Sequence, residues 1–156
     1  MRVKISITGL LIFVFNFTAF AYAREYKTAV GIRGSIGGEA IRGGGITVRH
    51  FFWQSATVEG IVSATNFSGT RLIGLYEYHF AIPEVEGLQW YAGGGMHITA
   101  LSSTTLWGID AIGGIEYTFG TIPLNIGLSW KPELNITGKT HTGFASDIAA
   151  HLRFSF

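Results

Sequence analysis

The sequence contains no cysteine, only 3 prolines among its 156 residues, and few charged residues, 13% of the chain. Without cysteine the chain can form no disulfide, no thiolate metal site and no cysteine nucleophile, and no lipid can be attached through a cysteine. The low charge, together with 47% hydrophobic residues, excludes a disordered protein and is unusual for a soluble globular one. A formal charge of +1 gives no indication of nucleic-acid binding.

Long apolar runs are also missing beyond the first residues of the chain. Two basic residues precede a mainly apolar stretch at residues 5–20, and AYA at 21–23 fits the small-x-small pattern of a signal-peptide cleavage site. We therefore predict a cleaved signal peptide at residues 1–23 and a single domain at residues 24–156. An uncleaved membrane anchor is the alternative, but the polar run REYKT follows at once. Because no later stretch is long enough for a membrane-spanning helix, a mature chain that crosses a membrane must form a closed barrel.

The rest of the sequence shows alternation with a period of two. In the last segment the apolar residues share one parity, while Asp147, His151 and Arg153 share the other. Seven earlier segments alternate in the same way, and no window has a sustained 3.6-residue period, so we expect strands and no helix. The eight predicted strands are residues 26–37, 42–52, 56–65, 70–80, 88–100, 106–119, 122–136 and 144–156.

The predicted strands fit a membrane barrel in length and number. A membrane-spanning strand takes about 9–11 residues. An even number of strands places both chain ends on one side, which is periplasmic in outer-membrane barrels. Turns near Gln54, at 83–87 and at Gly120 would lie on that side. Short loops near Gly38, near Ser68, at 102–105 and at 138–142 would lie outside.

The charged residues indicate which face of the barrel is the inside. Five bases and six acids share the polar parity: Arg33, Arg49, Arg71, Lys131, Arg153, Glu59, Glu77, Asp110, Glu116, Glu133 and Asp147. The other parity is almost entirely aliphatic, aromatic or glycine, which a soluble barrel would have to expose as a continuous apolar surface. In lipid that surface is required, and a charge on it would cost about 2–4 kcal/mol at the midplane. The sequence therefore predicts an all-β fold, an eight-stranded antiparallel up-and-down transmembrane β-barrel, with a secreted soluble barrel as the alternative.

Two further patterns agree with a narrow membrane barrel. The interior of an eight-stranded barrel is just wide enough for side chains to fill, so we expect the charged residues to pair with one another rather than line a pore. Glycine runs at 43–45 and 93–95 lie within alternating segments and fit bends in the wall. Outward aromatic residues near the strand ends fit aromatic girdles: Tyr78, Phe80, Trp90, Tyr117, Phe119, Phe154 and Phe156 at one end and Trp107 at the other.

Four runs of sequence resemble those of small outer-membrane β-barrels, the class that includes the OmpA transmembrane domain and OmpX-like proteins. They are GLYEYHF (74–80), WYAGGGMHI (90–98), GIDAIGGIEYTF (108–119) and PLNIGLSWKPELNI (123–136). The chain is closer still to the outer-membrane β-barrel domain proteins of Bacteroidota. The resemblance implies a location in the bacterial outer membrane, reached by secretion to the periplasm. It also implies that Phe154 and Phe156 form a signal for the outer-membrane assembly machinery, read by strand addition at an open edge.

Residues for catalysis or metal binding are hard to find in this sequence. His79, His97 and His151 share the inward parity, but the sequence has no HxH or HxxxH pair, so we expect them to join the interior polar network rather than a metal site. The nearest match to the His and Ser, two residues apart, of lipid A deacylases is His97-Ile98-Thr99, with Thr in place of Ser and inward parity. A nucleophile must reach both its base and its substrate. We therefore predict no catalytic residue, no cofactor and no metal.

The resemblance specifies architecture and location more than function. We expect a small non-enzymatic barrel that contributes to envelope structure or surface interaction. Its expected partners are outer-membrane lipid and the assembly machinery, not nucleic acid, and any surface partner is left open. The alternatives are a narrow solute channel, which the crowded interior charges disfavour, and a lipid-modifying enzyme. The short outer loops disfavour an adhesin, because receptor binding usually needs long loops.

Overall fold

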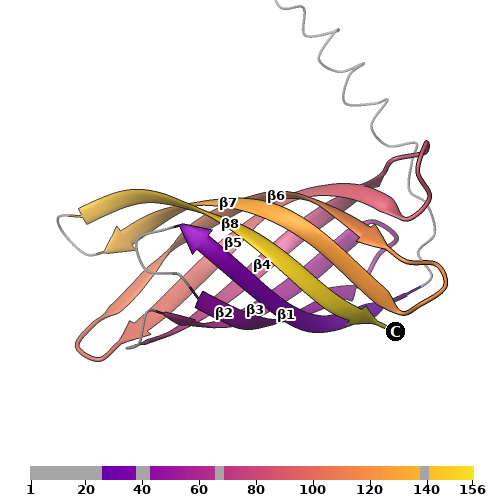
Figure 1. Ribbon diagram of the computed structural model, residues 1–156. Helices are drawn as coiled ribbons and strands as arrows, with labels where there is room; N and C mark the ends of the chain where they lie inside the picture. The colour runs from indigo at the N-terminus through magenta and orange to yellow at the C-terminus, as the bar shows by residue number, and fades with distance from the viewer. Residues whose placement is uncertain (1–25, 38–42, 66–68, 138–140) are drawn as a thin grey trace, which may run out of the picture.

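The computed structural model describes residues 26–37, 43–65, 69–137 and 141–156, which form eight β-strands in a closed barrel (Figure 1). The strands are β1 (Thr28–Gly37), β2 (Gly43–Phe51), β3 (Ala56–Thr65), β4 (Gly69–Ala81), β5 (Leu88–Leu101), β6 (Thr105–Thr118), β7 (Leu124–Thr137) and β8 (His141–Ser155). Each strand pairs antiparallel with its neighbours in the sequence, and β8 closes the barrel on β1. The predicted eight-stranded up-and-down barrel is confirmed.

The predicted strand bounds differ from the observed ones by at most three residues. The largest difference is at β8, which begins at His141 rather than at residue 144 because its ladder with β7 continues to the pair Thr137 and His141. The predicted signal peptide at 1–23 lies outside the described residues. In the described ranges no helix is long and apolar enough to cross a membrane.

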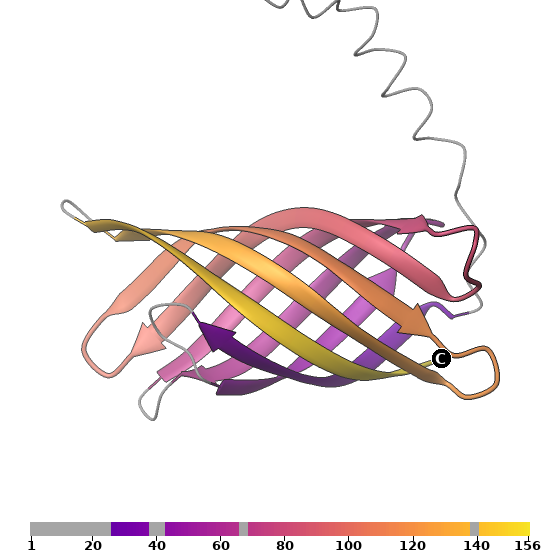
Figure 2. The ribbon, with the colours of Figure 1, turned by 45° about the horizontal axis from the view of Figure 1, so that its top comes forward.

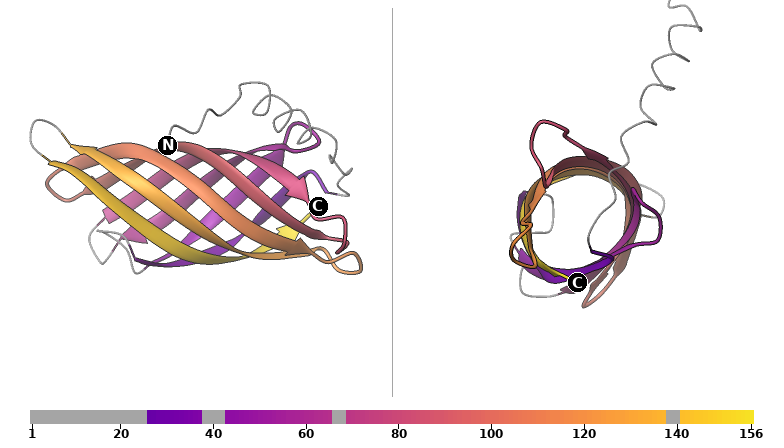
Figure 3. Two further views of the ribbon diagram at one scale, coloured as in Figure 1. Left: turned by 90° about the horizontal axis from the view of Figure 1, so that it is seen from above. Right: turned by 90° about the vertical axis from the view of Figure 1, so that its right-hand side faces the viewer.

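The connections at 52–55, 82–87 and 119–123 lie at the barrel end that carries the C-terminus, as predicted (Figures 1 and 3). We call this the terminal end. In the middle connection, Gly87 has a φ of 83°, a conformation that favours glycine, and its carbonyl accepts a hydrogen bond from Thr118 N at 2.9 Å. At the opposite end the 102–104 connection is short, while the predicted loops near Gly38, Ser68 and 138–142 lie wholly or mostly outside the described residues.

The outer surface of the barrel is an apolar sheath. The strands are strongly tilted and twisted around the barrel (Figure 2), and each of the eight contributes exposed apolar side chains to this sheath. Its aliphatic side chains are well exposed, for example Ile32 at 63% and Leu128 at 57%. Aromatic rings gather near the terminal end, where Phe80 stacks on Trp90 with ring centroids 4.1 Å apart. Tyr78, Tyr117, Phe119, Phe154 and Phe156 make further ring contacts in the same region.

Candidate functional site in the barrel interior

All eleven charged residues of the predicted interior set are buried inside the barrel. Because alternate residues of a strand point to opposite faces, their common parity brings them together from seven of the eight strands, all except β5. They form two groups at different depths. The terminal cluster, nearer the terminal end, consists of Arg49, Arg153, Glu59, Glu77 and Glu116. The distal cluster, nearer the opposite end, consists of Arg33, Arg71, Lys131, Asp110, Glu133 and Asp147.

Arg49 is the centre of the terminal cluster. Its guanidinium is fully buried and contacts three carboxylates, from β3, β4 and β6. Nη2 lies 2.7 Å from Glu59 Oε2 and 2.8 Å from Glu77 Oε2, and Nη1 donates to Glu116. The planar fork of arginine suits such multiple pairing, which lysine could not reproduce with the same geometry.

Arg153 is the second base of the terminal cluster. Its Nη2 donates to Glu59 Oε1 at 2.6 Å, and its Nη1 lies 3.7 Å from Glu116 Oε2. Thr47 donates its hydroxyl proton to the same Glu59 oxygen, so this carboxylate accepts bonds from three side chains. The barrel closes between β8 and β1, and Arg153 therefore links the closing strand β8 to β3 and β6 across the interior.

Lys131 occupies the corresponding central position in the distal cluster. Its Nζ donates to Asp110 Oδ1 at 3.1 Å and to Glu133 Oε2 at 2.7 Å, and lies 3.7 Å from Asp147 Oδ2. Arg71 binds Glu133 with both terminal nitrogens, at 2.7 and 3.2 Å. Arg33 is more loosely held, because its nearest carboxylate oxygen, on Asp147, is 3.6 Å away.

An apolar layer, which the sequence reasoning did not identify, separates the two clusters. It is formed by side chains that are almost completely shielded from solvent: Ile61, Ile73, Leu75, Tyr91 and Ile112. In β4 the inward residues run in order through Arg71, Ile73, Leu75 and Glu77, from the distal to the terminal cluster. The inward parity of these aliphatic residues was readable from the sequence, but their position between two charge clusters required the register of all eight strands.

A stack of rings closes the terminal end of the interior. Tyr26 meets Phe51 edge-on at 5.4 Å, Phe51 lies 5.1 Å from His79, and His79 stacks on Tyr91 at 5.0 Å. The guanidinium of Arg49 lies 4.7 Å from the Tyr91 ring centroid, within cation–π range. Together with the charged clusters and the apolar layer, these rings fill the inside of the barrel.

Inward-facing glycines make room for three of the interior rings. Tyr91, His97 and His151 each pair with a glycine on a neighbouring strand, at Gly114, Gly108 and Gly127 respectively. A Cβ at Gly114 would lie 2.5 Å from Tyr91 Cζ, and one at Gly127 would lie 2.6 Å from His151 Cε1. These inward glycines therefore allow the neighbouring ring to lie flat across the strand.

The side chains of His97, Asp110 and Glu133 come close enough to share a metal ion, since one ligand atom of each lies within 4.8 Å of the others. Their spacing in the sequence gave no signal because they come from three different strands. However, Lys131 already bridges Asp110 and Glu133, and Arg71 holds both oxygens of Glu133. A divalent ion would have to displace the ammonium and would then face a guanidinium. The arrangement fits an internal ion-pair network better than a metal centre.

The other residues discussed for chemistry also have defined positions. His97 lies between Asp110 Oδ2 and Asn135 Oδ1, each 2.9 Å from a ring nitrogen. Both His97 and Thr99 are inside the barrel and almost fully buried, so a lipid on the outer surface cannot reach them. Phe154 and Phe156 lie on the outer surface, 55% and 64% exposed.

Comparison with known proteins identifies structures of similar fold but no match in sequence. No protein-family model matches the chain, and no curated protein matches it in sequence. Among solved structures, the N-terminal β-barrel domain of Pseudomonas aeruginosa OprF matches 83% of this chain and 100% of its own, with a TM-score of 0.59 and 15% identity. The chain has the fold of a small transmembrane β-barrel.

Two further structures support the same fold. Neisserial surface protein A matches 86% of this chain and 99% of its own at a TM-score of 0.56 and 11% identity. A de novo designed transmembrane β-barrel matches 86% of this chain and 100% of its own at 0.57 and 10% identity. A shared fold does not by itself imply a shared activity. The closer resemblance to Bacteroidota proteins stays a prediction.

Proposed function

We propose that this protein is a small, non-enzymatic barrel of the bacterial outer membrane that contributes to the structure of the envelope. The observation that carries the proposal is the division between an apolar outer sheath and an interior filled with paired charges. Outside a membrane this sheath would expose to water an apolar surface larger than soluble proteins tolerate. The predicted signal peptide and the two outer-membrane proteins of the same fold, OprF and NspA, support this location.

The filled interior disfavours transport. One cavity inside the wall, lined by Arg33, Ser35, Ser63 and Asp147 among others, has a volume of only about 10 Å³. A cavity of that size holds about one water molecule. Residues of the distal cluster and of the apolar layer, Ile61 and Ile73, line this cavity, and the terminal cluster lies beyond it. A solute would therefore have to break buried ion pairs to pass.

The last strand is the proposed contact with the assembly machinery. Phe156 is the final rung of the seam between β8 and β1: its carbonyl accepts bonds from Lys27 N and Thr28 N, at 3.2 and 2.9 Å, and its amide donates to Thr28 O at 2.8 Å. Before β1 pairs with it, β8 presents an open edge with Phe154 and Phe156 on its outer face. Main-chain pairing with that edge and recognition of the two rings would account for an assembly signal.

Three measurements on the mature protein test the proposal. Density separation of membranes should place the protein in the outer membrane, and recovery as a soluble periplasmic protein would contradict the location. Reconstitution in planar bilayers should give no steady conductance, whereas selective, steady currents would support a channel. Incubation with lipopolysaccharide should leave its acyl composition unchanged by mass spectrometry, and loss or transfer of an acyl chain would establish an enzyme.

A further inference from the structure

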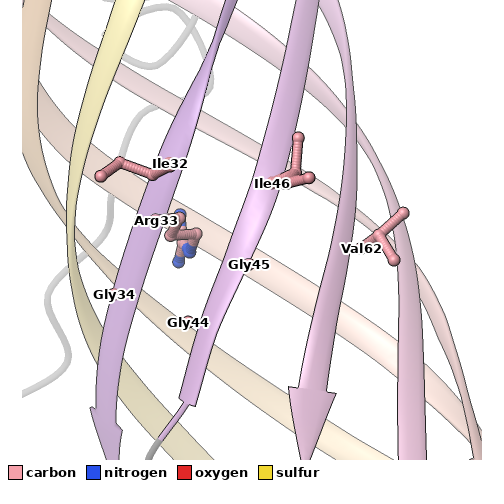
Figure 4. Close-up of a pocket in the computed structure, with 7 residues that line it drawn as sticks. All are labelled: Ile32, Arg33, Gly34, Gly44, Gly45, Ile46 and Val62. Carbon is pink, nitrogen blue, oxygen red and sulfur yellow. The ribbon is translucent and has the colours of Figure 1, made fainter.

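The apolar sheath is hollowed by a groove of about 540 Å³ over β1, β2 and β3 (Figure 4). Gly34 and Gly44 lie at its floor, and Ile32, Ile46 and Val62 stand in a row along one side of it. These three aliphatic side chains are 50–63% exposed, so they project from the wall rather than into it. The groove therefore opens on the face that the proposed function assigns to lipid.

The strand register explains the shape of the groove. Gly34 pairs with Gly44 on one side and with Ala150 on the other, which gives a row with almost no side chains. On one flank, a continuous ridge crosses four strands through the successive pairs of Leu152, Ile32, Ile46 and Val62. On the other flank, Ile36 pairs with Ile148. The floor is thus a narrow trough with a four-strand aliphatic ridge on one flank and, over β1 and β8, the pair Ile36 and Ile148 on the other.

We propose that this trough binds one acyl chain of a membrane lipid. The inference rests on the proposed membrane location. Ile32 and Ile36 are four residues apart on one strand, about 13 Å at a rise of 3.3 Å per residue, so their side chains leave room for one hydrocarbon chain between them. Arg33, which also borders the groove, has its guanidinium inside the barrel, 3.6 Å from Asp147, and gives the trough no charged group.

The chemistry of the trough favours a hydrocarbon chain over other occupants. Its described walls are aliphatic, so among the described residues a lipid headgroup would find no ion-pair partner there. A second copy of the chain would present its own convex sheath, which would meet the edges of a trough one residue row wide rather than its floor. A linear chain can lie along the glycine floor and contact both ridges, which ordinary neighbouring lipids on the convex sheath cannot do.

Two variants fill the trough without disturbing the wall. A Cβ at Gly34 meets nothing within 4 Å, and one at Gly44 has Arg33 O at 3.9 Å as its nearest neighbour, so Gly34→Leu and Gly44→Leu should both fold. Gly74→Leu is the matched control, because Gly74 of β4 also faces outward with nothing within 4 Å of its Cβ. It lies beyond the ridge, paired with Gly60 and Met96.

The test uses the protein in phosphatidylcholine vesicles that contain a small fraction of phosphatidylcholine with a diazirine on its acyl chain. After illumination, carbene insertion is mapped by peptide mass spectrometry. In the native protein, insertion into β1 and β2 should exceed insertion into β7 several-fold per exposed aliphatic residue. Gly34→Leu and Gly44→Leu should reduce it to the β7 level, and Gly74→Leu should leave the excess unchanged.

The contrary outcomes separate this inference from the proposed function. Equal insertion into all strands would overturn the acyl-chain site and leave the membrane location standing. Insertion into β1 and β2 below the level of β7 would also overturn it, in favour of a contact between two copies. Absence of insertion into every strand would contradict the membrane location itself.

Discussion

At the scale of single residues, the structure depends on which charges touch. Arg49 and Arg33 are both buried bases of the same interior, yet Arg49 contacts three carboxylates at close range and Arg33 approaches one at 3.6 Å. Buried ion pairs add little net stability compared with apolar packing, but removing one partner leaves an uncompensated charge. Removing a base should therefore lower the free energy of unfolding more when that base neutralises more carboxylates.

Replacing Arg49 with methionine should lower the free energy of unfolding by about 3–5 kcal/mol, because Glu59, Glu77 and Glu116 would face one another with one base fewer. Urea unfolding in lipid vesicles, followed by tryptophan fluorescence, measures this loss. Arg33→Met is the matched control and should cost clearly less. An equal loss for the two variants would show that the number of carboxylate contacts is not what matters.

Neighbouring glycines on β6 offer a second residue-scale test. Gly114→Ala would place a methyl group 2.5 Å from Tyr91 Cζ, push that ring off Arg49, and cost about 1–3 kcal/mol through overpacking. Gly113→Ala points outward, 3.9 Å from the nearest atom, and should change stability by no more than about 0.5 kcal/mol. The same unfolding assay applies, and a larger loss at position 113 than at 114 would reverse the assignment of the two faces.

At the scale of the strands, alternation in the sequence predicted nearly all of the structure. Each of the eight observed strands matches a predicted one, because a strand with different solvents on its two faces must alternate. Alternation could not predict how far along the barrel axis each inward side chain lies. Whether Arg71 of β4 meets Glu133 of β7 or Glu116 of β6 depends on the register between strands far apart in the sequence, and no local pattern records it.

The face assignment of one strand can be tested by a single outward charge. Leu128 of β7 is 57% exposed on the apolar sheath, so Leu128→Arg should cost about 2–4 kcal/mol in the membrane and greatly reduce the heat-resistant folded band on a gel. Gln54→Arg, in the exposed 52–55 turn, is the control and should fold normally. Normal folding of the Leu128 variant would mean that this side of β7 does not meet lipid.

At the scale of the whole molecule, the barrel is a closed wall around a nearly neutral, filled interior. The sequence predicted that the interior would be charged and nearly balanced, and it missed two features: the apolar layer around Ile61 and Ile112, and the ring stack from Tyr26 to Tyr91. Both consist of apolar residues with inward parity, which are hard to distinguish from the sheath when charge is the main signal. They divide the interior into layers, and this layering supports a structural role over transport.

The central claim is that the apolar face of this barrel meets lipid and the charged face does not. The chain has no cysteine, so single cysteines can be introduced and spin-labelled without background, at Ile126 and Leu128 of β7 and at Ile148, Ala150 and Leu152 of β8. In vesicles, each label should collide more often with dissolved oxygen, which concentrates in lipid, than with a water-soluble nickel chelate. More frequent collisions with the chelate at these positions would contradict the account.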